Sequence, residues 1–161
     1  MVNREVIEEW ATALESGEYP QTRGALRRVR PYGDQPAGFC CLGVLTELAV
    51  KAGVTEAARQ NRDGTVSYRN SWDENDPGLE MAQLPEIVRV WAGLPLADPT
   101  VSYLYTPEQV QGEFEEGVYE SSDEAWEELP RMSPSLAYLN DVHGRTFPEI
   151  AEIIRDNFLN G

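Results

Sequence analysis

The sequence predicts a mainly helical α+β fold, as one domain over residues 1–161 with a small β-hairpin or short sheet. Three observations predict this fold class. Apolar residues recur at helical spacing in three segments, 4–16, 40–52 and 147–158. The segment 61–70 instead combines a glycine turn with alternating residues, which is typical of a hairpin. A chain of 161 residues with 41% hydrophobic and 25% charged residues fits one soluble globular domain.

The first predicted helix begins after Asn3, a favourable N-cap, and ends before Gly17. Its apolar side chains form one stripe that we expect to be buried: Val6, Ile7, Trp10, Ala13 and Leu14. Residues 24–30 are expected to form either a short helix or an extended arm. Leu26 and Val29 are the expected anchors of this segment.

The second predicted helix runs from about Cys40 to Ala52, with Gly53 as its C-terminal stop. Its broad apolar face predicts a central position in the core: Cys41, Leu42, Leu45, Leu48 and Ala49. Gly43 lies inside this helix, where glycine costs about 1 kcal/mol relative to alanine. We therefore expect another backbone to approach Gly43 closely.

The middle of the chain gives weaker signals. A turn at residues 63–64 is expected to lead into a short strand at 66–68. Pro85 is expected in the first turn of a helix that Gly93 helps to end. Three further elements are expected: a strand at 101–105 and short acidic helices at 107–116 and 122–129.

The C-terminal part is the clearest. Ser133 is the expected N-cap, and Pro134 the first residue, of a helix that ends near Asp141. Thr146 and Glu149 have the spacing of a capping box that begins the last helix. The apolar stripe of that helix is Phe147, Ile150, Ala151, Ile154 and Phe158.

Composition excludes two classes of partner. The net charge of -15 disfavours DNA and RNA, because attraction to phosphates needs a basic face. No apolar run approaches the roughly 20 residues that span a bilayer, so no membrane contact is expected. The N-terminal residues are charged and amphipathic, and two adjacent cysteines make no disulfide framework. We therefore expect a cytoplasmic protein.

One long interval of the sequence is strongly acidic. No basic residue occurs between Arg89 and Arg131, and the carboxylates are concentrated at positions 108–128. Such a surface either keeps the protein soluble or binds a basic host protein.

Basic residues are concentrated in one place. Four of the 13 fall within eight positions: Arg23, Arg27, Arg28 and Arg30. Arginine forks suit phosphate and carboxylate groups, and the N-terminus of the following helix offers free N–H groups. These features predict a site for a small phosphorylated or nucleotide ligand. A base could stack on one of three aromatic side chains: Tyr32, Phe39 or Trp72. The alternative is that the arginines pair with the many carboxylates of the protein.

The two cysteines allow two interpretations. Cys40 and Cys41 are expected to be packing residues. The alternative is that Cys41 forms a thiolate favoured by the helix N-terminus. Residues 31–44 resemble the nucleophile segment of NlpC/P60 cysteine peptidases, in which a glycine-rich turn leads into a cysteine at a helix start. This resemblance implies a cysteine hydrolase with Cys41 as nucleophile and His143 as base, although Leu42 replaces the serine of that family.

Other functional sites are disfavoured by spacing. The acidic loop 73–78 lacks the pattern of an EF-hand, and the cysteines and His143 lack a fourth ligand for zinc. No metal or cofactor is therefore expected. The last two helices superficially resemble a helix-turn-helix, but acidic side chains surround Arg155 on the second helix, so no DNA binding is expected. Arg155 itself is expected on the exposed polar face, with little effect on stability.

The segment Phe39-Cys-Cys-Leu-Gly-Val44, together with Leu139-Asn-Asp and Gly144-Arg-Thr-Phe-Pro-Glu-Ile-Ala151, is similar to a group of small, uncharacterised phage and actinobacterial proteins. This resemblance covers most of the chain and implies a phage-type accessory protein in the host cytoplasm. Our leading hypothesis is a non-enzymatic binding protein, with anti-defence as one role. It would capture a phosphorylated or nucleotide ligand, or inhibit a host protein through residues 108–128. The sequence leaves open whether the protein forms a homo-oligomer.

Overall fold

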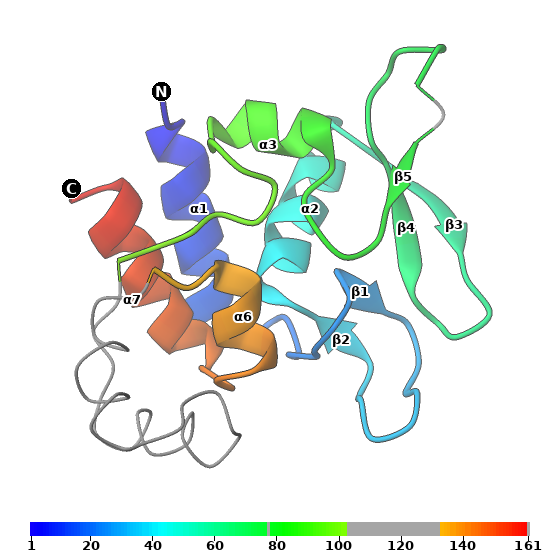
Figure 1. The fold of residues 1–161 in the computed structure, drawn as a ribbon, viewed down its shortest axis with the longest axis horizontal. Helices are drawn as coiled ribbons and strands as arrows, with labels where there is room; N and C mark the ends of the chain where they lie inside the picture. The colour runs from blue at the N-terminus through cyan, green and yellow to red at the C-terminus, as the bar shows by residue number, and fades with distance from the viewer. Residues whose placement is uncertain (77, 103–132, 161) are drawn as a thin grey trace, which may run out of the picture.

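The computed structural model describes residues 1–76, 78–102 and 133–160 (Figure 1). The described residues form an α+β fold with five helices and two small antiparallel sheets. The expected helices within residues 107–129, most of the expected strand at 101–105, and the acidic face at 108–128 lie outside the described residues. In the described part of the chain, no helix has the length and apolar character needed to cross a bilayer.

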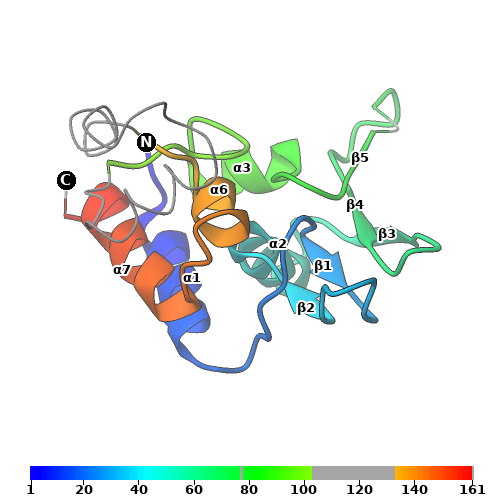
Figure 2. The same cartoon turned by 60° about the horizontal axis from the view of Figure 1, so that its bottom comes forward.

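The helices pack together on one side of the molecule. Helices α1 (Arg4–Glu15) and α7 (Phe147–Phe158) lie side by side in both ribbon views (Figures 1 and 2). Helix α2 (Cys41–Lys51) packs between α1 and the sheets, and contacts α3 (Glu86–Ala92) and α6 (Leu136–Asp141). One buried hydrophobic cluster includes side chains from all five helices, so the first and last segments share a core.

Helix α1 confirms its predicted cap and most of its predicted stripe. The side chain of Asn3 accepts a hydrogen bond from the Val6 amide. Trp10 is fully buried, and its indole Nε1 donates to the Cys41 carbonyl oxygen at 2.9 Å. The buried alanine is Ala11 rather than Ala13, which is only partly covered.

Helix α2 confirms the prediction made for Gly43. A Cβ at this glycine would overlap the carbonyl oxygen of Leu26. Leu26 is fully buried, and its carbonyl also accepts a hydrogen bond from the Cys40 amide at 3.3 Å. The arm that precedes the helix is therefore extended, and Leu26 is its anchor. The expected second anchor is wrong, because Val29 is 38% exposed.

The two sheets are small. Strand β1 (Arg27–Arg28) pairs with β2 (Gly38–Phe39), and the second sheet has the order β3 (Ala57–Gln60), β4 (Val66–Arg69), β5 (Leu79–Glu80). The turn and strand predicted at 63–68 are confirmed by the β3–β4 hairpin. Strands β3 and β5 were not predicted. All four residues of β3 are exposed, so the sequence carries no alternating pattern there.

Helix α3 ends as predicted, but Pro85 is its N-cap and not a residue of its first turn. Pro85 directly precedes its first residue, and Gly93, with a φ of 70°, ends it in the left-handed conformation. A Cβ at Gly93 would collide with the backbone of the N-terminal residues. The backbone amide of Asn3 also bonds to this end of α3, because it donates to the Ala92 carbonyl oxygen at 2.9 Å.

The start of α6 corrects a prediction. The N-cap is Ser135, whose hydroxyl accepts from the Tyr138 amide at 3.2 Å, and not Ser133. The reason is a tertiary contact: the Pro134 carbonyl oxygen accepts from the Val101 amide at 2.9 Å. This pairing holds residue 134 in an extended segment before the helix begins.

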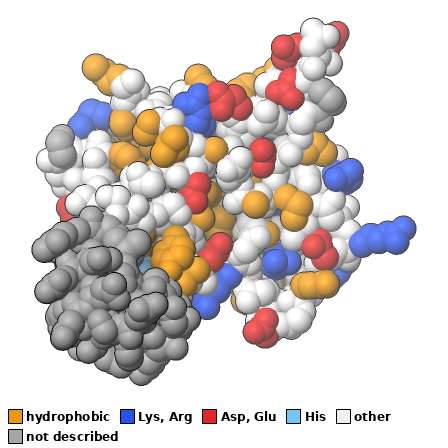
Figure 3. Space-filling model, in the orientation of Figure 1, with side chains coloured by type: hydrophobic (Ala, Val, Ile, Leu, Met, Phe, Trp, Pro, Cys, Tyr) orange, Lys and Arg blue, Asp and Glu red, His pale blue; other side chains and the backbone are white. Residues whose placement is uncertain are grey.

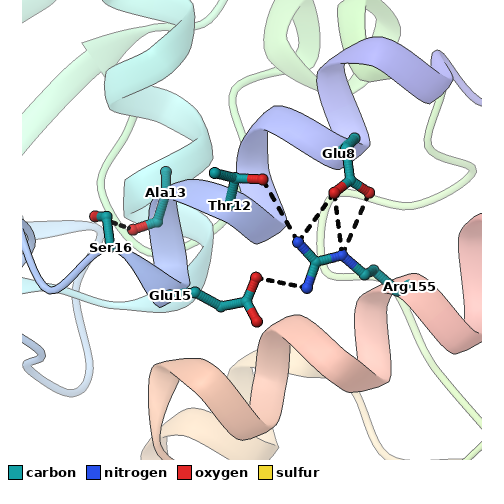
Figure 4. Close-up of polar contacts among 6 residues, drawn as sticks. All are labelled: Glu8, Thr12, Ala13, Glu15, Ser16 and Arg155. Carbon is teal, nitrogen blue, oxygen red and sulfur yellow. Dashed lines mark hydrogen bonds and ion pairs between the residues drawn. The ribbon is translucent and has the colours of Figure 1, made fainter.

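Helix α7 has the predicted capping box between Thr146 and Glu149. The expected exposure of Arg155 is corrected, because this side chain is only 27% exposed and connects α7 to α1 (Figure 4). Its expected small effect on stability stays a prediction. Its guanidinium donates to both carboxylate oxygens of Glu8 and forms an ion pair with Glu15 at 2.5 Å. The sequence of α7 alone could not show these partners, since they belong to another helix.

Candidate functional site

A buried polar network joins the segment before β1 to the connection between α6 and α7. Asn140 is fully buried, and its amide Nδ2 donates to the Thr22 carbonyl oxygen at 2.9 Å. Gln21 donates from its amide to Asn140 Oδ1 and to the Arg145 carbonyl oxygen, each at 2.8 Å. Residues 21–22 and 140–145, which are far apart in the sequence, therefore meet at this network.

The neighbouring residue extends this network. The Asp141 carboxylate accepts from the Gly24 amide at 3.1 Å and from Asn140 Nδ2 at 2.8 Å. These bonds hold the backbone that leads into the arginine-rich segment.

A polar cleft of about 370 Å³ lies beside this network, between residues 21–23, residues 34–36 and Gly144. The Thr22 hydroxyl joins the two walls by donating to the Pro36 carbonyl oxygen at 2.7 Å. Gly144 has a φ of 62°, and a Cβ there would lie 2.8 Å from Nη2 of Arg23. Glycine at this position therefore makes room for the Arg23 guanidinium.

A tight turn forms one wall of the cleft. Tyr32 and Gln35 exchange two backbone hydrogen bonds, at 2.9 and 3.0 Å, and Gly33 between them has a φ of 60°. The turn leaves Tyr32 59% exposed and places Asp34 at the cleft wall.

Successive side chains of a β-strand point to opposite faces, so the side chains of Arg27 and Arg28 point to opposite sides of β1. Arg27 lies over the Phe39 ring, 5.2 Å from its centroid, and its Nη1 is 3.8 Å from the Glu47 carboxylate. The Phe39 ring also meets Tyr19 edge to face at 5.3 Å. Arg27 and Phe39 therefore belong to a cluster that covers α2, and the alternative that the arginines pair with carboxylates holds for Arg27.

Arg28 points to the other side of β1 and is not among the residues that line the cleft. Its guanidinium carbon is 5.9 Å from the centroid of the Tyr32 ring, and its Nη2 donates to the Arg23 carbonyl oxygen at 3.5 Å. Nε and Nη1 of Arg28 are shielded from solvent and have no hydrogen-bond partner among the described residues. A ligand in the cleft therefore does not reach these two nitrogens.

One carboxylate is within electrostatic reach of Arg28. The pKa of Asp63 is lowered, first by the Thr65 hydroxyl and amide and to a smaller degree by the charge of Arg28. Because Asp63 accepts from Thr65 at 2.6 and 3.0 Å, it is held in the β3–β4 turn. Asp63 therefore accepts no hydrogen bond from Arg28, whose Nε and Nη1 have no partner among the described residues.

Five arginines, from residues 23–30 and from the β3–β4 hairpin, form no ion pair with any described residue: Arg23, Arg28, Arg30, Arg59 and Arg62. Several of the blue side chains in Figure 3 lie over β1 and the β3–β4 hairpin. Arg30 itself is held against the hairpin, because its guanidinium donates to the Arg62 carbonyl oxygen. Asp and Glu side chains lie among these blue side chains in the same view (Figure 3).

Trp72 is not brought to the cleft. Its indole Nε1 donates to the Val54 carbonyl oxygen at 2.7 Å, and Arg69 stacks on it at 4.7 Å. Val54 follows the C-terminal end of α2, whereas Phe39 precedes the N-terminal end. The 11 residues of α2 separate them by about 16 Å.

The N-terminus of α2 does not contribute to an anion site. Its first residues, from Cys41 to Val44, are buried, and the backbone of Leu26 covers Gly43. The expectation that this helix end holds phosphates is therefore wrong, because no ligand can reach its N–H groups.

The cysteines have the environment of packing residues. Cys41 is fully buried, and its thiol donates to the Leu136 carbonyl oxygen at 3.5 Å. Burial raises the pKa of Cys41 well above 9.0 and the pKa of Cys40 to about 12. His143 lies after α6, where its ring meets Tyr138 edge to face at 5.0 Å. A buried, protonated thiol is unsuited to nucleophilic attack, so the structure lends no support to a hydrolase.

We expect the free energy of unfolding to decrease as the pH rises from about 9 to about 12. Burial raises the folded-state pKa of Cys40 from 9.0 to about 12 and that of Tyr68 from 10.0 to about 12. The unfolded chain therefore loses these protons first, and the stabilisation present below pH 9 is lost over this interval. Urea unfolding at several pH values measures the effect, and Cys40→Ala should reduce it. Constant stability up to pH 11 would contradict the burial of these groups.

A family model described as a domain of unknown function, DUF8296, matches residues 2–158. The chain belongs to the DUF8296 family. The match covers every helix and strand from α1 to α7, so the cleft is built from residues of this DUF8296 domain. Comparison with curated proteins and with solved structures gave no match. The family description gives no activity, so the phage-type role stays a prediction.

The arginine pattern of this DUF8296 chain led to one residue that lines the cleft, Arg23. Sequence reasoning missed Gln21, Asp34 and Asn140. The only signal for Asn140 was its place in the Leu-Asn-Asp segment, because a polar residue inside an apolar helical pattern is expected to need a buried partner.

Proposed function

We propose that this chain is a single-domain, mainly helical binding protein that captures a small phosphorylated ligand in the cleft lined by Arg23. The observation that carries the proposal is the Arg23 guanidinium. Arg23 is exposed, lines the cleft and forms no ion pair with any described residue. A phosphoryl group supplies several acceptor oxygens and a compensating charge, which suit such a guanidinium.

The electrostatics of this region support the same ligand. A chain with a net charge of -15 repels anions at long range, so an anion binds only where the local field is positive. The unpaired arginines of residues 23–30 and of the β3–β4 hairpin provide such a field. The phosphate of the ligand would lie near Arg23, where Gly144 leaves room for the guanidinium.

The proposed protein is a capture module and not an enzyme. The cleft walls contribute arginine, amide, hydroxyl and backbone groups, which bind and orient a ligand. The thiols lie in the core and do not line the cleft. Sequestering a phosphorylated signal is a role that suits the phage-type accessory protein implied by the sequence resemblance, including anti-defence.

We expect Arg23→Ala to weaken the binding of pyrophosphate by about 10- to 150-fold, the equivalent of one lost hydrogen-bonded charge. Isothermal titration calorimetry at low ionic strength measures this, and the affinity should decrease as salt is added. Arg27→Ala is the matched control, because this side chain does not line the cleft and pairs with Glu47. The proposal is wrong if pyrophosphate does not bind, or if both variants weaken binding equally.

A further inference from the structure

We infer that the ligand of the cleft is a small phosphate monoester that also carries an ammonium group. Its phosphate would lie at Arg23 and its ammonium group at Asp34, the two charged residues that line the cleft. This inference rests on the proposed phosphate site at Arg23. It adds a second contact, which selects among phosphorylated compounds.

Two polar side chains of the cleft are already committed to the fold. The Gln21 amide nitrogen donates twice within the buried polar network, and the Thr22 hydroxyl donates to the Pro36 carbonyl oxygen. The two charged side chains of the lining, Arg23 and Asp34, remain for a ligand.

These two charges do not neutralise each other. Neither Arg23 nor Asp34 forms an ion pair with any described residue. In the described part of the chain, the Asp34 carboxylate accepts one long hydrogen bond, from the Gln35 amide at 3.5 Å. Both charged residues are exposed, so a ligand can reach them. The cleft thus presents one unpaired cation and one unpaired anion.

The walls that carry the two charges are fixed relative to each other. Arg23 follows Thr22, a buried residue whose hydroxyl bonds to the Pro36 carbonyl oxygen at 2.7 Å. Asp34 belongs to the turn 32–35, which two backbone hydrogen bonds close. A ligand therefore meets both charges in a defined arrangement, and little ordering of the backbone accompanies binding.

Opposite charges in one cleft select a ligand that carries both complementary charges. Asp34 repels a ligand that has only a phosphate, whereas it accepts hydrogen bonds from an ammonium group. The cleft volume of about 370 Å³ lies near the lower end of the range for small-molecule sites. An aminoalkyl phosphate such as O-phosphoethanolamine has this combination of size and charge.

The test is calorimetric titration of the full chain with O-phosphoethanolamine and with ethyl phosphate, which has the same phosphate and no ammonium group. We expect O-phosphoethanolamine to bind more tightly by about 5-fold, the range of one ion pair at an exposed site. Asp34→Asn should weaken the binding of O-phosphoethanolamine and strengthen that of ethyl phosphate. The reason is that it removes an attraction in the first case and a repulsion in the second. A general loss of folding would weaken both.

Glu74→Gln is the matched control, since it removes one negative charge at an exposed position that does not line the cleft. It should leave the ratio of the two affinities unchanged, and an effect as large as that of Asp34→Asn would contradict a local contact. Vesicles that contain phosphatidylethanolamine present a phosphate and an ammonium group on a lipid. The protein should not sediment with them, and sedimentation would contradict a small soluble ligand.

The outcomes separate this inference from the proposed function. If ethyl phosphate binds at least as tightly as O-phosphoethanolamine, the ammonium site is wrong and the phosphate site stands. The same holds if Asp34→Asn changes both affinities in the same direction. If neither compound binds and pyrophosphate does not bind, both the proposed function and this inference are wrong.

Discussion

Replacing Gly43 with alanine is expected to cost more than about 3 kcal/mol of the free energy of unfolding, or to prevent folding. The added Cβ would overlap the carbonyl oxygen of Leu26 and lie 2.6 Å from its carbonyl carbon. This backbone cannot move aside, because Leu26 is fully buried and its carbonyl holds the Cys40 amide. In an isolated helix the same substitution would be stabilising by about 1 kcal/mol, so the tertiary contact reverses the sign.

Urea unfolding followed by circular dichroism measures this cost. Gly17→Ala is the matched control, since a Cβ added at Gly17 would have no neighbouring atom within 4 Å. It should cost only about 1–2 kcal/mol, from its positive φ. If Gly43→Ala is as stable as the unmodified protein, the close approach of α2 and the Leu26 backbone does not exist.

Asn140→Ala is expected to cost about 2–4 kcal/mol, because two groups lose their hydrogen bonds to this buried side chain, one of them a buried carbonyl. These groups are the Thr22 carbonyl oxygen and the Gln21 amide, which bond to the two polar atoms of the Asn140 side chain. The same change should weaken pyrophosphate binding, since residues 21 and 22 form part of the cleft.

The measurement combines chemical unfolding with calorimetric titration of the folded variant. Asn75→Ala, at an exposed position, is the control and should cost under about 0.5 kcal/mol. A stable Asn140→Ala variant with unchanged affinity would show that the polar network does not position the cleft.

The helices of this fold could be predicted where their signals are local. The Asn3 cap and the capping box of Thr146 and Glu149 depend on residues within one turn, and both are observed. Ser133 and Ser135 offer equally good local caps. The choice between them is made by the contact of Pro134 with Val101, which no local pattern contains.

The sheets and the site depend more on distant residues. Strand β3 is exposed on both faces, so it has neither an apolar run nor an alternation that could mark it. The arginine cluster was visible in the sequence, but the different roles of Arg27 and Arg28 follow from the pairing of β1 with β2. Gln21 and Asn140 are 119 positions apart, and only the folded chain brings them together.

The location of the ligand tests the central claim most directly. Two-dimensional ¹H–¹⁵N nuclear magnetic resonance spectra, recorded as pyrophosphate is added, report which amides and guanidinium Nε–H groups are affected. We expect the largest shifts in residues 21–23, in residues 34–36 and at Gly144, with the Arg23 Nε–H among them. The amides around Trp72 and along α1 should change little. Shifts concentrated on α1 and α7, or no shifts at saturating pyrophosphate, would contradict a phosphate-binding cleft at Arg23.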